Sequence, residues 1–166
     1  MDRIGLSESI FGTFVHDMYC GFDTSKSFSE NHGWIEYALK KRDYDDLIPA
    51  EWMHQAMNGL FQFLNDTYVN YTLHKELPIQ AMNEAGQYIE GYVDLVVEVG
   101  GTLLIIDYKT FVIQDYDPTI YQKKALEYSG QLASYARLLE KSFGKPVDGT
   151  FIYFVFEGKM MEVKES

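Results

Sequence analysis

Apolar side chains recur every three to four residues in three stretches of the chain, and this spacing predicts three helices. The three helices are expected over residues 7–20, 49–71 and 118–143. The last of them is expected to end at Gly144, a residue type that commonly follows a helix. The apolar positions fall on one face of each helix, so each helix is expected to pack against a core. The polar stretch over residues 21–33 is expected to be irregular.

The second half of the chain changes to short runs rich in Val, Ile and Leu, which are typical of β-strands. Strands are expected over residues 76–79, 88–99, 102–110, 150–156 and 159–163. Gly100 and Gly101 lie between two of these strands, and a Gly-Gly pair is typical of a two-residue hairpin turn. The expected fold class is therefore α/β (α+β), with a mixed central β-sheet flanked by helices, in a single domain over residues 1–166.

The predicted hairpin brings two carboxylates together. With the two glycines as the turn, the register places Asp94 opposite Asp107. Facing side chains share one side of a sheet, with Cβ atoms about 5 Å apart, and Lys109 projects from the same side as Asp107. Two carboxylates at this distance repel each other by about 3 kcal/mol at an effective dielectric of about 20. Such a pair needs a cation, a shared proton or a basic neighbour.

A divalent metal ion bound by both carboxylates would remove this repulsion, and oxygen ligands of this kind suit Mg²⁺ or Mn²⁺. Lys109 could then orient or deprotonate an attacking water, while the metal stabilises charge on phosphoryl oxygens. The register alone leaves an alternative open. In that alternative, Asp107 and Lys109 form an ordinary surface ion pair and Asp94 faces solvent.

Composition and charge narrow the class of protein. No apolar run approaches the 18 or so residues that a membrane span needs, and the first residues lack the pattern of a secretory signal. We therefore expect a cytoplasmic protein without a membrane partner. The single cysteine, Cys20, excludes an intrachain disulfide and a four-cysteine metal site. The net charge of −11 argues against a free-standing DNA-binding protein, because such proteins are usually basic.

Several motifs, in order along the chain, resemble those of RecB-type nucleases of the PD-(D/E)xK class. The core signature of that family is similar to Glu90-Gly-Tyr-Val-Asp94 followed by Leu104-Ile-Ile-Asp-Tyr-Lys-Thr110. The family's G-T-x-x-H and Q-x-x-x-Y elements are similar to Gly12-Thr-Phe-Val-His16 and Gln131-Leu-Ala-Ser-Tyr135. Glu76-Leu-Pro78 resembles the short E-x-P strand that precedes the core signature. Together the motifs span roughly residues 16–135.

The resemblance implies a restriction-endonuclease-like PD-(D/E)xK core and a set of metal ligands. Asp94 and Asp107 would bind one or two Mg²⁺ or Mn²⁺ ions, with the backbone carbonyl of Tyr108 as a further ligand. His16 would complete the site through a neutral imidazole nitrogen. No iron–sulfur cluster is expected, because one cysteine cannot supply the four that other branches of the family carry.

The resemblance also implies catalytic residues beside the carboxylates. Lys109 would act on the attacking water. Gln131 and Tyr135 lie one helical turn apart on the same face, so both would reach the site or the DNA. Glu76 receives no assigned role, because the family's use of this position varies.

The implied function is a Mg²⁺- or Mn²⁺-dependent DNA exonuclease that acts in double-strand break repair and recombination. The AddA/RecB branch of the family is favoured, in which the nuclease domain is part of a larger helicase polypeptide. The expected partners are DNA, the helicase domain of the same polypeptide and a second helicase-nuclease polypeptide as partner subunit. A helicase that feeds a strand to the site would reconcile the acidic charge with a DNA substrate. The alternatives are a catalytically silent nuclease-like domain for DNA binding or for the assembly of subunits, and a metal-dependent hydrolase of a non-nucleic substrate.

Overall fold

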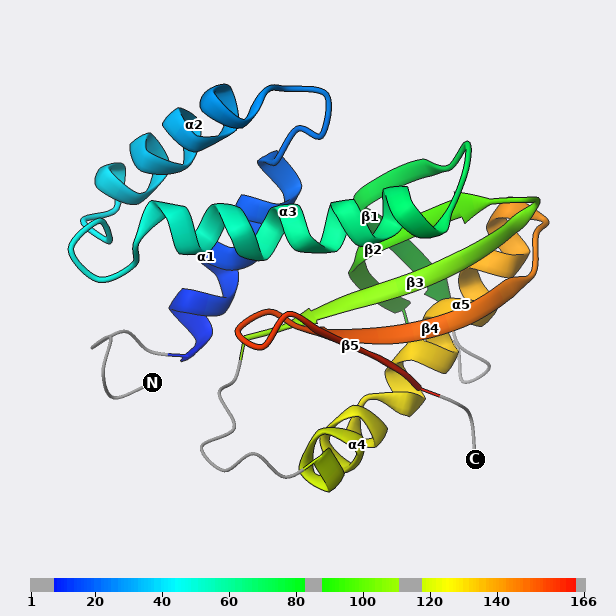
Figure 1. Cartoon of the computed structure of the whole chain (residues 1–166). Helices are drawn as coiled ribbons and strands as arrows, with labels where there is room; N and C mark the ends of the chain where they lie inside the picture. Colours follow the sequence, from blue (N-terminus) through cyan, green and yellow to red (C-terminus); the bar gives the residue numbers. More distant parts are fainter. Residues whose placement is uncertain (1–7, 83–87, 111–117, 164–166) are drawn as a thin grey trace.

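The computed structural model describes residues 8–82, 88–110 and 118–163. One mixed sheet of five strands, in the order β1-β2-β3-β4-β5, has helices on both faces (Figure 1). The strands are β1 (Thr72–Met82), β2 (Tyr88–Val99), β3 (Thr102–Lys109), β4 (Val147–Phe154) and β5 (Lys159–Glu162). The helices are α1 (Glu8–Gly21), α2 (Phe28–Lys41), α3 (Ala50–Thr67), α4 (Pro118–Glu127) and α5 (Ser129–Phe143). The expected fold class is confirmed.

The sheet combines antiparallel and parallel pairing. Strands β1, β2 and β3 form an antiparallel meander, β3 and β4 are parallel, and β5 returns antiparallel to β4. A parallel pair needs a long crossover connection, and α4 and α5 lie in this connection (Figure 1). Over the residues that the structure describes, no helix is both long and apolar enough to cross a membrane.

Strand β3 is buried on both faces because each face of the sheet has its own core. Leu104 and Ile106 belong to the core under α1, α2 and α3. Leu103 and Ile105 belong to the core under α4 and α5, as the two-residue alternation of a strand requires. The run of apolar residues before Asp107 is therefore a central strand that carries this carboxylate to the end of the sheet's most buried segment.

The hairpin between β2 and β3 has the predicted turn. Gly100 and Gly101 have φ angles of 60° and 89°, and two consecutive positive φ angles are what a type I′ turn requires. Val99 pairs with Thr102 next to the turn, so the predicted register is confirmed where β2 and β3 are paired.

Helix α2 contradicts the prediction of an irregular stretch over residues 21–33, because the helix begins at Phe28. Ser27 caps it: the Ser27 side chain accepts a hydrogen bond from the Glu30 backbone N–H, and the Glu30 carboxylate accepts one from the Ser27 backbone. This S-x-x-E capping box was the sequence signal for the helix. The residues that it buries, Ile35 and Leu39, are too few for an apolar stripe to stand out.

Three other boundaries differ from the prediction. The helix expected over residues 118–143 is two helices, α4 and α5, which are separated at Tyr128. The helix expected to reach residue 71 ends at Thr67, and the strand expected over residues 76–79 is the longer β1. The predicted helix end at Gly144 is confirmed, with the glycine in the left-handed conformation at φ 64°.

Candidate functional site

The candidate site lies where β2 and β3 separate. Their backbone pairing ends at Leu95 and Ile106, one position before Asp94 and Asp107. The Oδ2 atom of Asp94 accepts a hydrogen bond of 2.6 Å from the backbone N–H of Tyr108. The Asp94 carboxylate therefore takes the place of a partner strand at this fork. The expected opposition of Asp94 and Asp107 as a regular strand pair is corrected by this arrangement, because the ladder does not continue to them.

The alternation of both neighbouring strands breaks at this level. On β2, Val93 and Leu95 are two residues apart but belong to the cores on opposite faces of the sheet. On β1, Glu76 has a φ of 48°, a left-handed conformation that is rare for residues with a Cβ atom. It interrupts a ladder that otherwise pairs Lys75 with Leu95 and Leu77 with Val93. Such irregularities redirect side chains out of the regular pleat, and strained backbone of this kind is concentrated at functional sites.

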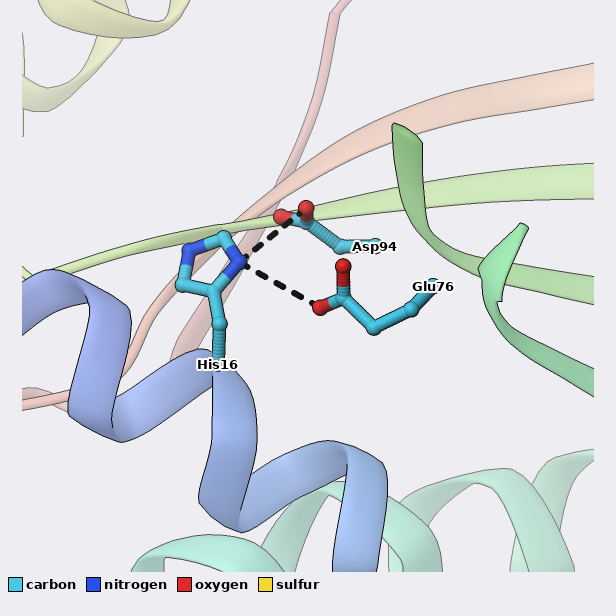
Figure 2. Close-up of side chains that lie close together, drawn as sticks. All are labelled: His16, Glu76 and Asp94. Carbon is cyan, nitrogen blue, oxygen red and sulfur yellow. Dashed lines mark ion pairs between the residues drawn. The ribbon is translucent and has the colours of Figure 1, made fainter. Parts of the chain in front are cut away.

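Three side chains from separate elements converge at the fork. His16 from α1, Glu76 from β1 and Asp94 from β2 point toward one another (Figure 2). The Nδ1 atom of His16 is 3.2 Å from Asp94 Oδ1 and 3.5 Å from Glu76 Oε1. One ligand atom from each residue lies within 4.8 Å of the other two, which is the spacing of a potential metal site. Within the described ranges, this is the one group of three such ligands.

Helix α1 reaches the fork because of a glycine one turn before the histidine. A Cβ atom added at Gly12 would lie 3.4 Å from the side-chain oxygen of Thr110, so a larger residue would press α1 away from the end of β3. The His16 ring also packs edge-on against the Tyr108 ring, with 5.8 Å between their centroids. The two motif segments that contain these residues are therefore in direct contact, although they are far apart in the sequence.

The second carboxylate of the site, Asp107, is paired with the lysine that follows it. Lys109 Nζ lies 2.6 Å from Asp107 Oδ2 and 4.1 Å from the centroid of the Tyr128 ring. Burial, followed by the negative charge of Asp94, raises the pKa of Asp107 from 3.8 to about 6 in spite of the lysine. The Asp107 side chain is buried, so the proximity of the two carboxylates is energetically unfavourable at neutral pH.

The surroundings of His16 are strongly negative. Burial alone would lower its pKa, but hydrogen bonds and charge interactions with Asp94 and Glu76 raise it from 6.5 to about 10. An imidazolium ion therefore supplies the positive charge that the two carboxylates require. A divalent cation among these three residues could supply that charge instead, which would release the imidazole proton and free a nitrogen for coordination.

Helix α5 brings Gln131 and Tyr135 to the other side of the fork. Gln131 Nε2 donates a hydrogen bond of 2.8 Å to the Tyr135 hydroxyl. A Cβ atom added at Gly91 would already touch that hydroxyl at 3.5 Å, so the glycine leaves room for the ring. Burial raises the pKa of Tyr135, and the charges of Asp107 and Asp94 add to the effect. This hydroxyl is therefore within electrostatic reach of both carboxylates.

The structure thus gathers the expected site residues at one place, with two differences. Glu76, which had no assigned role, lies in the cluster with His16 and Asp94, whereas Asp107 lies beside Lys109. The Tyr108 backbone contacts the cluster through its N–H, which binds Asp94. The E-x-P motif contained the signal for Glu76, but a strand expected to be only four residues long could not be given a register with β2.

Known proteins that resemble this chain are bacterial polypeptides that bear the name of an ATP-dependent helicase/nuclease. The one from Bacillus cereus is 32% identical over 188 residues, which covers 99% of this chain and 15% of that protein. The protein of the same name from Bacillus thuringiensis is 34% identical with the same coverage. The one from Oceanobacillus iheyensis is 28% identical over 106 residues, covering 55% of this chain and 8% of that protein. The chain therefore spans only a small part of the length of these relatives.

Two further comparisons concern the fold and the family. The structure described as "Crystal structure of SSO0001" covers 90% of this chain and 64% of that chain, with 17% sequence identity and a TM-score of 0.38, which is too low to support an argument. The model of the PD-(D/E)XK nuclease superfamily matches residues 2–165. Because this match extends over nearly the whole sequence, the chain belongs to the PD-(D/E)XK nuclease superfamily.

Proposed function

We propose that this chain is a divalent-metal-dependent DNA nuclease that hydrolyses phosphodiester bonds. The observation that carries the proposal is the convergence of His16, Glu76 and Asp94 beside the ion pair of Asp107 and Lys109. Membership of a nuclease superfamily supports a phosphodiester as the substrate. The repulsion between buried carboxylates supports a cation as part of the active state.

The proposed metal ligands are His16, Glu76, Asp94 and Asp107, with the Tyr108 carbonyl as a further ligand. Carboxylate oxygens favour Mg²⁺ and Mn²⁺, and an imidazole nitrogen shifts the preference of the set toward Mn²⁺. The number of carboxylates would suffice for one or two ions. When bound, such an ion polarises a phosphoryl oxygen and lowers the pKa of a bound water.

The remaining residues act on water and substrate. The Lys109 ammonium is held by Asp107 and by the face of the Tyr128 ring, so it has a defined position from which to orient the attacking water. The water oxygen forms a bond to phosphorus while the bond to the leaving oxygen breaks. Gln131 and Tyr135 are hydrogen-bonded to each other, and their polar groups would position a phosphate or sugar of the DNA.

We also propose that the chain acts as the nuclease part of a longer helicase-nuclease, together with a partner subunit, in recombinational DNA repair in the cytoplasm. The names of its bacterial relatives support this context. The net charge of −11 supports it as well, because an acidic domain repels the DNA backbone and benefits from a motor that delivers the strand.

The test is cleavage of labelled DNA by the full chain in Mn²⁺ or Mg²⁺. Asp107→Ala and Lys109→Ala should each reduce the cleavage rate by about a hundredfold or more, since each removes a group that acts at the reacting phosphate. Asp46→Ala and Lys123→Ala, which change exposed residues away from the fork, are the matched controls. Wild-type cleavage by Asp107→Ala would refute the catalytic assignment. A wild-type chain that binds metal and DNA without cutting would instead support the silent nuclease-like alternative.

A further inference from the structure

One face of the β1–β2 ribbon carries an exposed stripe of side chains. Cross-strand partners share a face of a sheet, and three such pairs are consecutive here. They are Pro78 with Tyr92, Gln80 with Glu90, and Met82 with Tyr88. All six residues are exposed, and the large ones strongly so, with Tyr92 at 57%, Tyr88 at 60% and Met82 at 72%. We call these six residues the tyrosine stripe.

The opposite face of the same ribbon packs normally. Ile79 and Val93 alternate with the stripe residues and are buried in the core under α4 and α5. The ribbon is therefore anchored on one side, and the stripe is not a frayed end of the sheet. In the described part of the chain, neither tyrosine of the stripe takes part in a hydrogen bond or a ring contact, which leaves both ring faces open to a ligand.

The stripe is continuous with the metal-ligand cluster. Tyr92 lies two residues before Asp94 on β2, and Pro78 lies two residues after Glu76 on β1. At about 3.3 Å per strand residue, Tyr92 is about 7 Å from the carboxylate along β2, and Tyr88 is about 13 Å further on. An extended ligand that lies along the ribbon would therefore end at the fork.

The chemistry of the stripe favours the bases of an unpaired strand. Its tyrosine rings and the Met82 thioether offer flat and adaptable apolar contacts, whereas its one charged residue, Glu90, repels phosphates. A duplex presents phosphates outward and hides the faces of its bases in the stack. An unpaired strand exposes base faces, which stack on aromatic side chains without regard to sequence.

We propose that the tyrosine stripe binds single-stranded nucleic acid, with Tyr92 and Tyr88 each stacked on an unpaired base of the strand that enters the fork. This inference rests on the proposed nuclease function and specifies its substrate. It also provides a way for a chain of net charge −11 to hold DNA, because base stacking needs no basic groove. Binding of this kind should depend only weakly on salt, since few phosphates are neutralised.

The test compares two single strands of equal length and charge, an oligothymidylate and an abasic deoxyribose-phosphate strand, bound to the full chain in Ca²⁺. The wild-type chain should bind the strand with bases about tenfold or more tightly. Tyr92→Ala and Tyr88→Ala should each lose most of this preference, whereas Tyr92→Phe should keep it because the ring remains. Tyr37→Ala, a change at an equally exposed tyrosine on α2, is the matched control.

Equal wild-type affinity for the two strands would overturn the inference, as would a Tyr92→Ala variant that keeps the full preference. Tighter binding of a blunt duplex than of the single strand would also overturn it. The binding arm needs no turnover, so it stays distinct from the proposed function, which fails if the wild-type chain in Mn²⁺ cuts none of these strands. Circular dichroism of each variant would verify that these exposed substitutions leave the fold intact.

Discussion

The backbone N–H of Tyr108 donates its hydrogen bond to the side chain of Asp94, at 2.6 Å, just beyond the last paired residues of β2 and β3. This contact joins the structural and the proposed catalytic roles of Asp94 in one carboxylate. One oxygen satisfies a buried strand donor, and the other lies 3.2 Å from His16 Nδ1. The first prediction separates the two roles.

Asp94→Ala should be less stable than Asp94→Asn. Both changes remove the negative charge, but only alanine leaves the Tyr108 N–H buried without an acceptor, which costs about 1–3 kcal/mol. The measurement is the free energy of unfolding in urea, with EDTA present. Both variants should lose metal binding equally. Equal stability of the two variants would mean that the amide does not replace the carboxylate oxygen at this donor.

Stability without metal should depend on the ionisation of Asp107. Its pKa is raised from 3.8 in the unfolded chain to about 6 in the folded chain, by burial and then by Asp94. The folded state therefore binds the proton more tightly, so this contribution to stability is fully present below pH 3.8 and is lost as the pH rises through 6. The loss amounts to about 2–3 kcal/mol.

Asp107→Asn removes this titration and isolates its effect. The difference in unfolding free energy between Asp107→Asn and the wild type should grow in favour of the variant between pH 4 and pH 7, by about 2–3 kcal/mol, in EDTA. Asp46→Asn, at an exposed site, should show no such change. A difference that is constant with pH would contradict the raised pKa.

Mn²⁺ should raise the melting temperature of the wild-type chain. A ligand at a hundred times its Kd adds about 2.7 kcal/mol to the stability of the folded state. His16→Ala and Glu76→Gln should each reduce this shift, because each removes one of the three converging ligand atoms. His74→Ala is a suitable control, since His74 is paired with Glu98 away from the fork. A full Mn²⁺ shift in Glu76→Gln would remove Glu76 from the ligand set.

The left-handed backbone of Glu76 predicts a reversed order of stability for glycine and alanine. At φ 48°, a residue with a Cβ atom is strained by about 1–2 kcal/mol, so Glu76→Gly should be more stable than Glu76→Ala by about 1 kcal/mol in EDTA. At Gln80, on the same strand, the glycine variant should instead be the less stable one. The same order at both positions would show that residue 76 relaxes when its carboxylate is removed.

The parts of the site that local sequence determines were predictable. Gly100 and Gly101 fix the turn, the turn fixes the register of β2 and β3, and the register brings Asp94 close to Asp107 and Lys109. Each step depends on residues that are adjacent in the chain, so the alternation of a strand is enough to connect them.

The rest depends on contacts that local patterns do not encode. The role of Glu76 follows from the full length of β1 and from a break in its ladder, neither of which is visible in a four-residue apolar run. The direction of the His16 ring depends on how closely α1 packs against Thr110. Helix α2 was missed because its capping box precedes a mostly polar segment, and its buried face forms only when α3 packs against it.

The two-residue turn between β2 and β3 also has a consequence for the order in which the molecule folds. A hairpin with so short a loop closes within microseconds, because little chain entropy is lost. Asp94 and Asp107 are therefore expected to meet early in folding. His16 must travel from the far end of the chain, and the parallel pairing of β3 with β4 must wait for a long crossover to form. A newly synthesised chain would thus hold its acidic pair long before the histidine completes the cluster, so tight metal binding would mark the end of folding.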